Sequence, residues 1–174
     1  MAWLQAQKPQ TAVTGIFEAS VWASLRVARG RDRDYSGEGE SEGEGKASFG
    51  IVSTGKVWEE LLTDAVKKYF GASAPREKVG VRFAGVETTG LNATDLHGAP
   101  AEEVRRRMKE ATRRLARKRD LAAVCLGCAG MAGMDVMVRE ALVEELGKER
   151  GMEVQIVDGV LAGVRWLEEQ LNSS

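Results

Sequence analysis

The sequence is poor in the residues that build disulfide frameworks and metal centres. It has two cysteines, Cys125 and Cys128, and one histidine, His97. Two cysteines three positions apart do not staple a secreted fold, and one distant histidine does not complete a four-ligand zinc site with them. No apolar run approaches the roughly 20 residues that a bilayer helix needs, and residues 1–10 lack the pattern of a secretion signal. We therefore expect a cytoplasmic protein that binds no metal and does not contact a membrane.

Net charge is nearly absent as well. The 26 acidic and 25 basic residues leave a formal charge of −1, so overall charge does not indicate nucleic acid or a membrane surface as a partner. Hydrophobic residues at 43% and charged residues at 29% are typical of a folded chain and exclude disordered and collagen-like proteins. The 174 residues accommodate one ordinary domain and at most a fragment of another.

Patterns typical of strands alternate with helical spacing over most of the chain. We expect strands at residues 11–16, 49–52, 79–86, 121–126 and 154–157. We expect helices at residues 18–28, 58–69, 102–119, 135–146 and 160–171, with Asp135 as an N-cap and with Val104, Met108, Ala111 and Leu115 on one apolar stripe. This alternation predicts an α/β fold, a parallel sheet covered by helices on both faces.

One segment differs in composition from the rest. From Arg29 to Lys46 charged residues alternate with glycine, and Tyr35 is the only apolar residue. Such a stretch cannot bury a core face, so we expect a flexible, solvated insertion at residues 29–47.

In a parallel sheet, ligands bind where the strands end at their carboxyl edge. Residues 50–57 nearly spell a phosphate-binding loop there, but Val57 replaces the hydroxyl residue and Gly50 falls inside the expected strand, which disfavours nucleotide hydrolysis. The hydroxyls of Ser53 and Thr54, beside free N–H groups at a helix start, fit a carboxylate or imide oxygen. An ordinary capped turn remains the alternative.

The two cysteines have different expected roles. Cys125 falls within the strand pattern and is expected to be a buried structural thiol. Cys128 follows Gly127 in a glycine-rich turn near a helix start, where a thiol can act as a base or a nucleophile, or can be inert. His97 is expected to be a surface or hydrogen-bonded loop residue, and the arginines of residues 102–119 are expected on the solvated side of an outer helix without nucleic-acid contacts.

Four stretches in order resemble the Asp/Glu/hydantoin racemase family: TGIFEASV (14–21), FGIVSTGKVWEELL (49–62), VCLGCAGMAGM (124–134) and VQIVDGVLAGV (154–164). The glycine–cysteine–alanine–glycine–methionine turn is the most specific of them. The resemblance implies two pseudo-symmetric α/β lobes around a cleft, a small-molecule substrate and no cofactor. It also implies one cysteine from each lobe at the substrate's α-carbon, one thiolate removing the proton and the opposite thiol returning one.

At matching positions, Cys128 is similar to the second-lobe catalytic cysteine of that family. The resemblance implies that substrate contacts come from Gly127 and Ala129 beside it and from the loop Ser53, Thr54 and Gly55, and that Glu18 and Asp158 line or support the cleft.

The resemblance also divides the chain into regions. Residues 1–28 would be a remnant of the first lobe, 29–47 the insertion, 48–158 the second lobe, and 159–174 a helix packing toward the first lobe. The family's first catalytic cysteine precedes the TGIFEAS segment, where this chain has none, so we expect a protein cut at its amino end.

Inversion needs an acid and a base on opposite faces of a carbanion, so racemisation is expected to be impaired. Alternatives are a one-cysteine enzyme similar to arylmalonate decarboxylases and a non-catalytic remnant or oligomerising module. The helices at 18–28 and 160–171 are expected to expose apolar faces and favour homo-oligomers.

Overall fold

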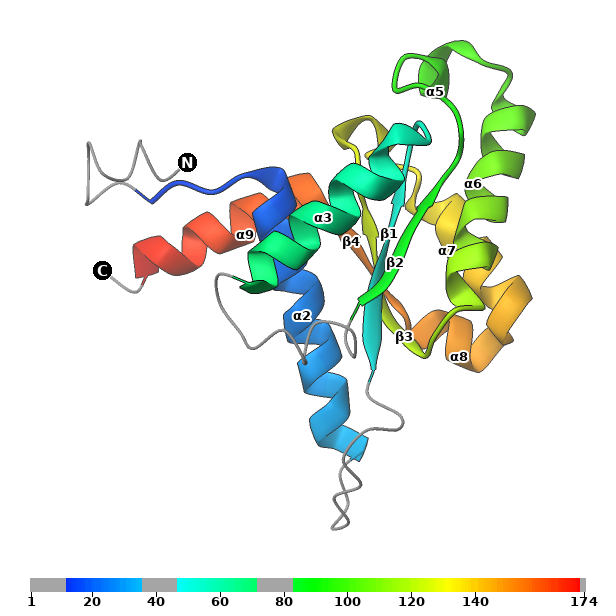
Figure 1. Cartoon of the computed structure of the whole chain (residues 1–174). Coiled ribbons are helices and arrows are strands. Elements are labelled where there is room, and N and C mark those ends of the chain that lie inside the picture. Colours follow the sequence, from blue (N-terminus) through cyan, green and yellow to red (C-terminus); the bar gives the residue numbers. More distant parts are fainter. Residues whose placement is uncertain (1–11, 36–46, 72–82, 173–174) are drawn as a thin grey trace.

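The computed structural model describes residues 12–35, 47–71 and 83–172. These residues build one four-stranded sheet with helices on both faces (Figure 1). The strands are β1 (Ser48–Ser53), β2 (Phe83–Thr88), β3 (Leu121–Leu126) and β4 (Gln155–Asp158), in the spatial order β2-β1-β3-β4. All three pairings are parallel. The predicted α/β class is therefore confirmed.

Helices form two layers around this sheet. One layer contains α2 (Ile16–Tyr35) and α3 (Val57–Gly71), and α9 (Gly159–Asn172) packs against α2. The other contains α6 (Ala101–Ala116) and α7 (Asp135–Leu146), followed by α8 (Lys148–Glu153). Two short elements, α5 (Asp95–Gly98) and the 3₁₀ turn η2 (Ala129–Met131), lie in the loops after β2 and β3. The short elements and α8 were not anticipated from the sequence.

The two central strands are buried on both faces, which explains their continuous apolar sequences. Side chains on β1 alternate between the layers, with Phe49 and Ile51 in the cluster that includes α2 and α3, and Val52 in the cluster with α6 and α7. Gly50 faces α6, where an added Cβ would lie only 2.6 Å from the Leu115 Cδ1 atom. Gly50 is thus a packing residue within β1 and no part of a phosphate loop.

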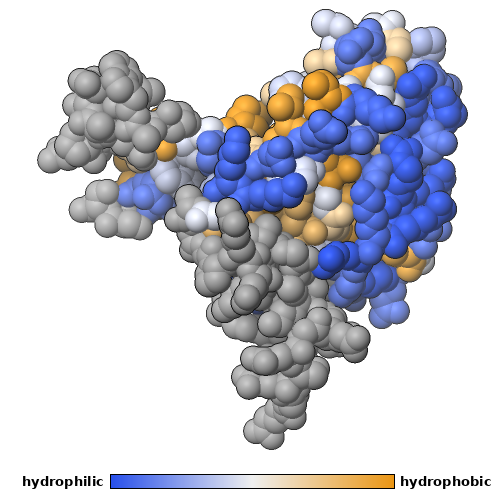
Figure 2. Space-filling model, viewed as in Figure 1, coloured by the Kyte–Doolittle hydropathy of each residue, from blue (hydrophilic) through white to orange (hydrophobic). Residues whose placement is uncertain are grey.

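The helix α6 has the apolar stripe that its sequence predicts: Val104, Met108, Ala111 and Leu115 are at most 3% exposed. Several cationic residues lie on the other side, where ion pairs join α6 and its C-cap residue Arg117 to acidic residues of α7: Arg105–Glu140, Lys109–Glu144, Arg113–Glu144 and Arg117–Glu145. Figure 2 shows the hydrophilic surface over this helix. These pairs give four of the cationic side chains of this region partners within the chain.

The amino-terminal region differs from the sequence-based expectation in two ways. Residues 12–15 form no strand, because the chain enters α2 at Ile16, with the Ala19 N–H bonded to the Gly15 carbonyl at 3.0 Å. The helix then continues to Tyr35, into the segment expected to be flexible. A single glycine such as Gly30 destabilises a helix by only about 1 kcal/mol. The helical turns that pack against the sheet can therefore continue past it. Residues 36–46 lie outside the described ranges.

The apolar side of α2 also differs from the expectation that it is exposed. Val21, Leu25 and Ala28 are at most 6% exposed because they pack against the sheet, so this helix does not present them to solvent. By contrast α9 exposes Val160, Val164, Leu167 and Leu171, as predicted.

One helix boundary and one strand boundary also differ from the sequence-based expectation. Asp135 is the first residue of α7, the cap position belongs to Met134, and no side chain caps that end. Gly147 ends α7 at φ 83°, as its sequence position predicts. The strand β2 ends at Thr88, so Glu87 and Thr88 belong to the sheet and not to the following loop. Of the strand expected at 79–86, residues 79–82 lie outside the described ranges.

Candidate functional site

The loops that follow β1, β2 and β3 meet at the carboxyl edge of the sheet (Figure 1). Strand pairing continues past the ends of β1 and β2: the Thr89 N–H donates to the Ser53 carbonyl at 2.9 Å and the Gly90 N–H to the Thr54 carbonyl at 3.0 Å. The Gly127 N–H, directly after β3, donates to the Val52 carbonyl at 2.8 Å. The site loops are therefore bonded to their neighbours where the sheet ends.

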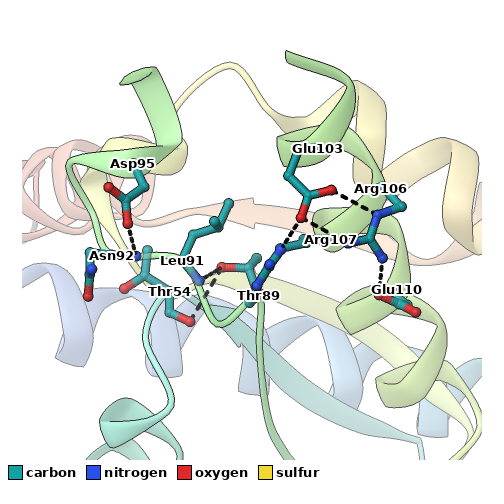
Figure 3. Close-up of polar contacts among 9 residues, drawn as sticks. All are labelled: Thr54, Thr89, Leu91, Asn92, Asp95, Glu103, Arg106, Arg107 and Glu110. Carbon is teal, nitrogen blue, oxygen red and sulfur yellow. Dashed lines mark hydrogen bonds and ion pairs between the residues drawn. The ribbon is translucent and has the colours of Figure 1, made fainter. Parts of the chain in front are cut away.

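The loop after β2 is held by its own side chains (Figure 3). The Thr89 hydroxyl donates to the Thr54 carbonyl at 3.4 Å and accepts the Leu91 N–H at 3.2 Å. The Asn92 N–H donates to Asp95 Oδ2 at 3.0 Å, which fixes the start of α5. Leu91 is buried, so the loop is anchored from within as well.

A charged cluster on α6 supports the same loop from outside. The Arg107 guanidinium lies 3.5 Å from the Thr89 carbonyl and pairs with Glu103 at 2.6 Å (Figure 3). Hydrogen bonds from Arg106, and then from Arg107, lower the pKa of Glu103 to about 2. Gly90, at φ 73°, passes so close to Arg107 that an added Cβ would lie 3.3 Å from its guanidinium.

Ser53 is the most unusual polar residue at this edge. Its side chain is 1% exposed, and its hydroxyl finds no hydrogen-bond partner among the described residues. An added Cβ on Gly127 would lie 3.2 Å from Ser53 Oγ and 2.7 Å from Ile51 Cγ2, so glycine is required there for β3 to end beside β1. A buried hydroxyl without a partner costs roughly 1–3 kcal/mol, and a ligand or a water molecule at this point would recover that energy.

The two cysteines lie in different environments. Cys125 is 2% exposed within β3, in the cluster with α2. Burial raises the pKa of its thiol to about 12; the Ser20 hydroxyl opposes this rise and the Asp158 carboxylate adds to it. Because the thiolate is the reactive form, Cys125 is a structural thiol.

Cys128 is partly exposed and lies just before η2, with Gly127 and the exposed Ala129 on either side. Its carbonyl accepts the Met131 N–H at 2.9 Å, which closes the turn. An added Cβ on Gly130 would lie 3.6 Å from Cys128 Sγ and 3.9 Å from His97 Nε2. The imidazole and the thiol therefore flank the same glycine.

The two residues predicted to line or support the cleft, Asp158 and Glu18, have different surroundings. The Asp158 carboxylate accepts the Val160 N–H at 2.8 Å and the Leu161 N–H at 3.1 Å, so it caps α9. It also lines two cavities of about 340 and 550 Å³ beside β4. Glu18, in the first turn of α2, lies near Tyr69: burial raises the pKa of that phenol first, and the Glu18 charge raises it further.

Comparison with known sequences decides the family. A sequence model of the Asp/Glu/hydantoin racemase family matches residues 5–167. This chain belongs to the Asp/Glu/hydantoin racemase family. An uncharacterised protein of Schizosaccharomyces pombe, C1F7.10, is 29% identical over 154 residues, which are 88% of this chain and 51% of that protein.

Two solved racemase structures share the fold. The allantoin racemase from Pseudomonas fluorescens aligns with 90% of this chain and 51% of its own, at a TM-score of 0.56 and 22% identity. The allantoin racemase from Klebsiella pneumoniae aligns with 92% of this chain and 50% of its own, at a TM-score of 0.62 and 20% identity. The chain spans about half the length of each of these relatives.

The structure shows where the site residues predicted for this racemase-family chain lie. Ser53 lies against Gly127, which places the loop Ser53, Thr54 and Gly55 beside the turn of Cys128 and Ala129. Asp158 is the register partner of Leu126, so it lies at the same carboxyl edge and also caps α9. Glu18 lies near Tyr69 in the first turn of α2. Within the described ranges, no group of three His, Cys, Asp or Glu residues is arranged to hold a metal ion.

The sequence-based expectation for His97 agrees with the structure, because His97 is exposed on the short helix α5 within the loop after β2. Its position near Gly130, on another loop, has no signal in the neighbouring sequence. No helix in the described part of this chain has the length and apolar character to cross a membrane.

Proposed function

We propose that this chain carries a cofactor-independent proton-transfer site, in which the Cys128 thiol exchanges the proton on the α-carbon of a small substrate. The observation that carries the proposal is the contrast between the two thiols: Cys128 is partly exposed at the carboxyl edge, and Cys125 is buried. Family membership supports this chemistry. The candidate substrates are hydantoins, allantoin and amino acids, whose α-protons lie next to a carbonyl group.

The neighbouring groups suit the polar end of such a substrate. The first turn of α3 carries the positive end of the helix dipole, although the Trp58 and Glu59 N–H groups already donate to the Gly55 and Lys56 carbonyls. The Ser53 hydroxyl is buried and has no partner among the described residues. The dipole would favour carbonyl, imide or carboxylate oxygens there while the α-carbon lies toward Cys128.

With a single thiol, a proton leaves and returns on one face of the carbanion. We therefore expect the chain to exchange the α-proton with solvent and to retain the configuration. An enzyme with one cysteine that protonates a carbanion after decarboxylation requires the same geometry, which keeps arylmalonates among the substrates to be assayed.

The test is incubation of the chain in deuterated water with 5-substituted hydantoins, allantoin, aspartate, glutamate and an arylmalonate. Mass spectrometry and NMR follow deuterium incorporation, and polarimetry follows inversion. We expect incorporation without inversion, abolished by Cys128→Ser and retained by Cys125→Ala. Inversion would contradict the one-thiol account, and incorporation that survives Cys128→Ser would remove Cys128 from the reaction.

A second function, self-association through α9, is favoured by one observation. Val160, Val164, Leu167 and Leu171 recur at helical spacing and are 39–76% exposed, forming an apolar row on the outside of the helix. We propose a second copy of this chain as the occupant of that row. Sedimentation velocity should detect dimers, and Val164→Glu combined with Leu167→Glu should return monomers. Monomers of the unmodified chain at high concentration would rule this out.

A further inference from the structure

The two edge strands of the sheet differ in how they are protected. Among the described strands, β2 pairs only with β1, and β4 pairs only with β3. On β2 the pairing register shifts once, and Gly85 has φ 106°. The Glu87 carboxylate also pairs with Arg114 and Lys118, each at 2.6 Å. Bulges and charged side chains of this kind keep an edge strand from pairing with another chain. The β2 edge is therefore protected.

β4 has neither kind of protection. Its sequence, Gln155-Ile156-Val157-Asp158, contains no lysine or proline, and its register against β3 runs without a shift. Asp158, the one charged residue of the strand, is engaged in capping α9. An edge strand directs alternate backbone N–H and C=O groups away from its neighbour. β4 thus presents a regular row of such groups on its open side.

Cavities flank β4 on both faces of the sheet. The cavity of about 340 Å³ lies between β4, α2 and α9, and the cavity of about 550 Å³ lies between β4, α7 and α9. The residues that line both are Gln155, Ile156, Asp158 and Leu161. Leu161 is 60% exposed, and Val136, in the larger cavity, is 58% exposed. The edge therefore carries exposed apolar side chains beside hollows that side chains of a second surface can fill.

We propose that the open edge of β4 binds the same edge of a second copy of this chain, so that two four-stranded sheets join into one continuous sheet. This inference rests on the self-association proposed above, and it adds the strand through which the copies meet. Every copy carries one open β4 edge and one protected β2 edge. The assembly therefore closes at two copies and does not extend into a fibre.

The sequence of β4 fits pairing with itself. A two-fold axis makes the two β4 strands antiparallel. Facing residues of an antiparallel pair direct their backbone groups alike, both toward the partner strand or both away from it. Because that direction alternates along the strand, a pairing that uses most of β4 is centred on Ile156 or on Val157, and each centre places an apolar residue opposite its own copy. Asp158 then faces Val154 or Ile156, and never another carboxylate.

The helix that follows β4 supports a second copy as the occupant of the edge. The apolar row of α9 assigned to the same partner begins at Val160, two residues after the strand ends. Leu161, Arg165 and Glu168 follow one another at helical spacing on a neighbouring face of α9. Arg165 and Glu168 have opposite charges and form no ion pair with the described residues. Two-fold symmetry reverses their order in the second copy, so opposite charges face each other where the two helices approach.

Hydrogen–deuterium exchange of the full chain at a series of protein concentrations tests the pairing. Peptide mass spectrometry follows residues 154–159, which contain β4, and residues 83–88 of β2 as the control edge. Because backbone hydrogen bonds protect amides, the β4 amides should exchange about tenfold more slowly at the highest concentration than at the lowest. The exchange of β2 should not change with concentration.

Two substitutions at exposed positions should remove the pairing. Gln155→Lys and Leu161→Lys place a lysine at the open edge, where the two copies would repel each other. Each should raise the dissociation constant of the dimer in sedimentation velocity by about tenfold. Leu61→Lys, at a leucine of α3 that is 53% exposed, is the matched control and should leave the constant unchanged. Circular dichroism and thermal unfolding show that each variant is folded.

The outcomes separate pairing at β4 from self-association through α9. Dimers that persist in Gln155→Lys and Leu161→Lys, with β4 exchange independent of concentration, would overturn the pairing. If Val164→Glu combined with Leu167→Glu then dissolved those dimers, self-association through α9 would stand alone. Slow exchange of β4 at every concentration would mean that something other than a second copy covers the edge, and would also overturn the pairing. Concentration-dependent protection of β4 that survives the α9 variant would refute the α9 row only, and monomers at all concentrations would refute both.

Discussion

Cys125 and Cys128 are close neighbours in the sequence, yet they occupy different chemical environments. Cys125 lies within β3, between β1 and β4 and beneath α2, where burial holds the pKa of its thiol at about 12. Cys128 lies past Gly127, on the loop that leaves the sheet, and is partly exposed. The interior of a parallel strand suppresses thiol chemistry, and the edge of the same sheet makes it available.

The largest expected effect is selective labelling of the two thiols. A pKa raised from 9.0 to about 12 lowers the thiolate fraction of Cys125 about a thousandfold at neutral pH. Iodoacetamide on the native protein should therefore modify Cys128 and leave Cys125 intact. Unfolding in guanidinium should equalise the two rates and serves as the control. Equal labelling of Cys125 and Cys128 in the native protein would contradict the expected difference in thiol reactivity between the strand interior and the sheet edge.

A smaller effect is expected at Gly127, where strand β3 ends and the loop at the sheet edge begins. Gly127→Ala would place a Cβ 2.7 Å from Ile51 Cγ2 and 3.2 Å from Ser53 Oγ, so it should lower the free energy of unfolding by about 1–3 kcal/mol through overpacking. Gly163→Ala, within α9 and with no atom within 4 Å of the new Cβ, is the matched control. It should be neutral or stabilising by up to about 1 kcal/mol.

Urea unfolding of both variants measures these energies. Equal stability of Gly127→Ala and the unmodified chain would show that the end of β3 is not tightly packed against β1.

The smallest effect concerns the exposed contacts that hold the edge loops. The pKa of Glu103 is lowered from 4.5 to about 2 by its hydrogen bonds to Arg106 and Arg107. A lowered carboxyl pKa stabilises the folded state above the unfolded value, and this contribution disappears as pH falls through the folded value. Glu103→Gln should thus be slightly less stable than the unmodified chain above about pH 4.5, with the difference vanishing toward about pH 2.

Thermal unfolding at several pH values measures this difference. Glu102→Gln, one residue earlier and with the same change of charge, is the control. A difference that grows as the pH falls would have the wrong sign and would assign the ion pair no stabilising role.

Periodicity predicted most of the sheet and its helices, because burial on one or two faces leaves a regular trace in the sequence. The stripe on α6 and the continuous apolar run of β3 are examples. The prediction was wrong at residues 12–15, where β-prone residues found no neighbouring strand, and at residues 29–35, where helix α2 continued through charged and glycine residues. Local propensity does not show which segment will be packed against the sheet.

The candidate site was predictable in part. The expectation that Ser53, Thr54 and Gly55 lie near Gly127 and Cys128 follows from the rule that parallel strands end at one edge, and the close approach of Ser53 to Gly127 agrees with it. The role of Asp158 as the cap of α9 depends on where that helix begins, which the sequence left open within a residue or two.

The sequence by itself determined that the chain alternates strands and helices and that Cys125 is a strand residue. It also determined that the chain resembles the racemase family. Only the tertiary structure brought His97 to Gly130 and Cys128, left the Ser53 hydroxyl buried without a partner among the described residues, and paired the cations of α6 with the acids of α7. The physical reason is that burial patterns are local and written along each segment, whereas contacts between loops arise only when packing fixes the separate strands at a common edge.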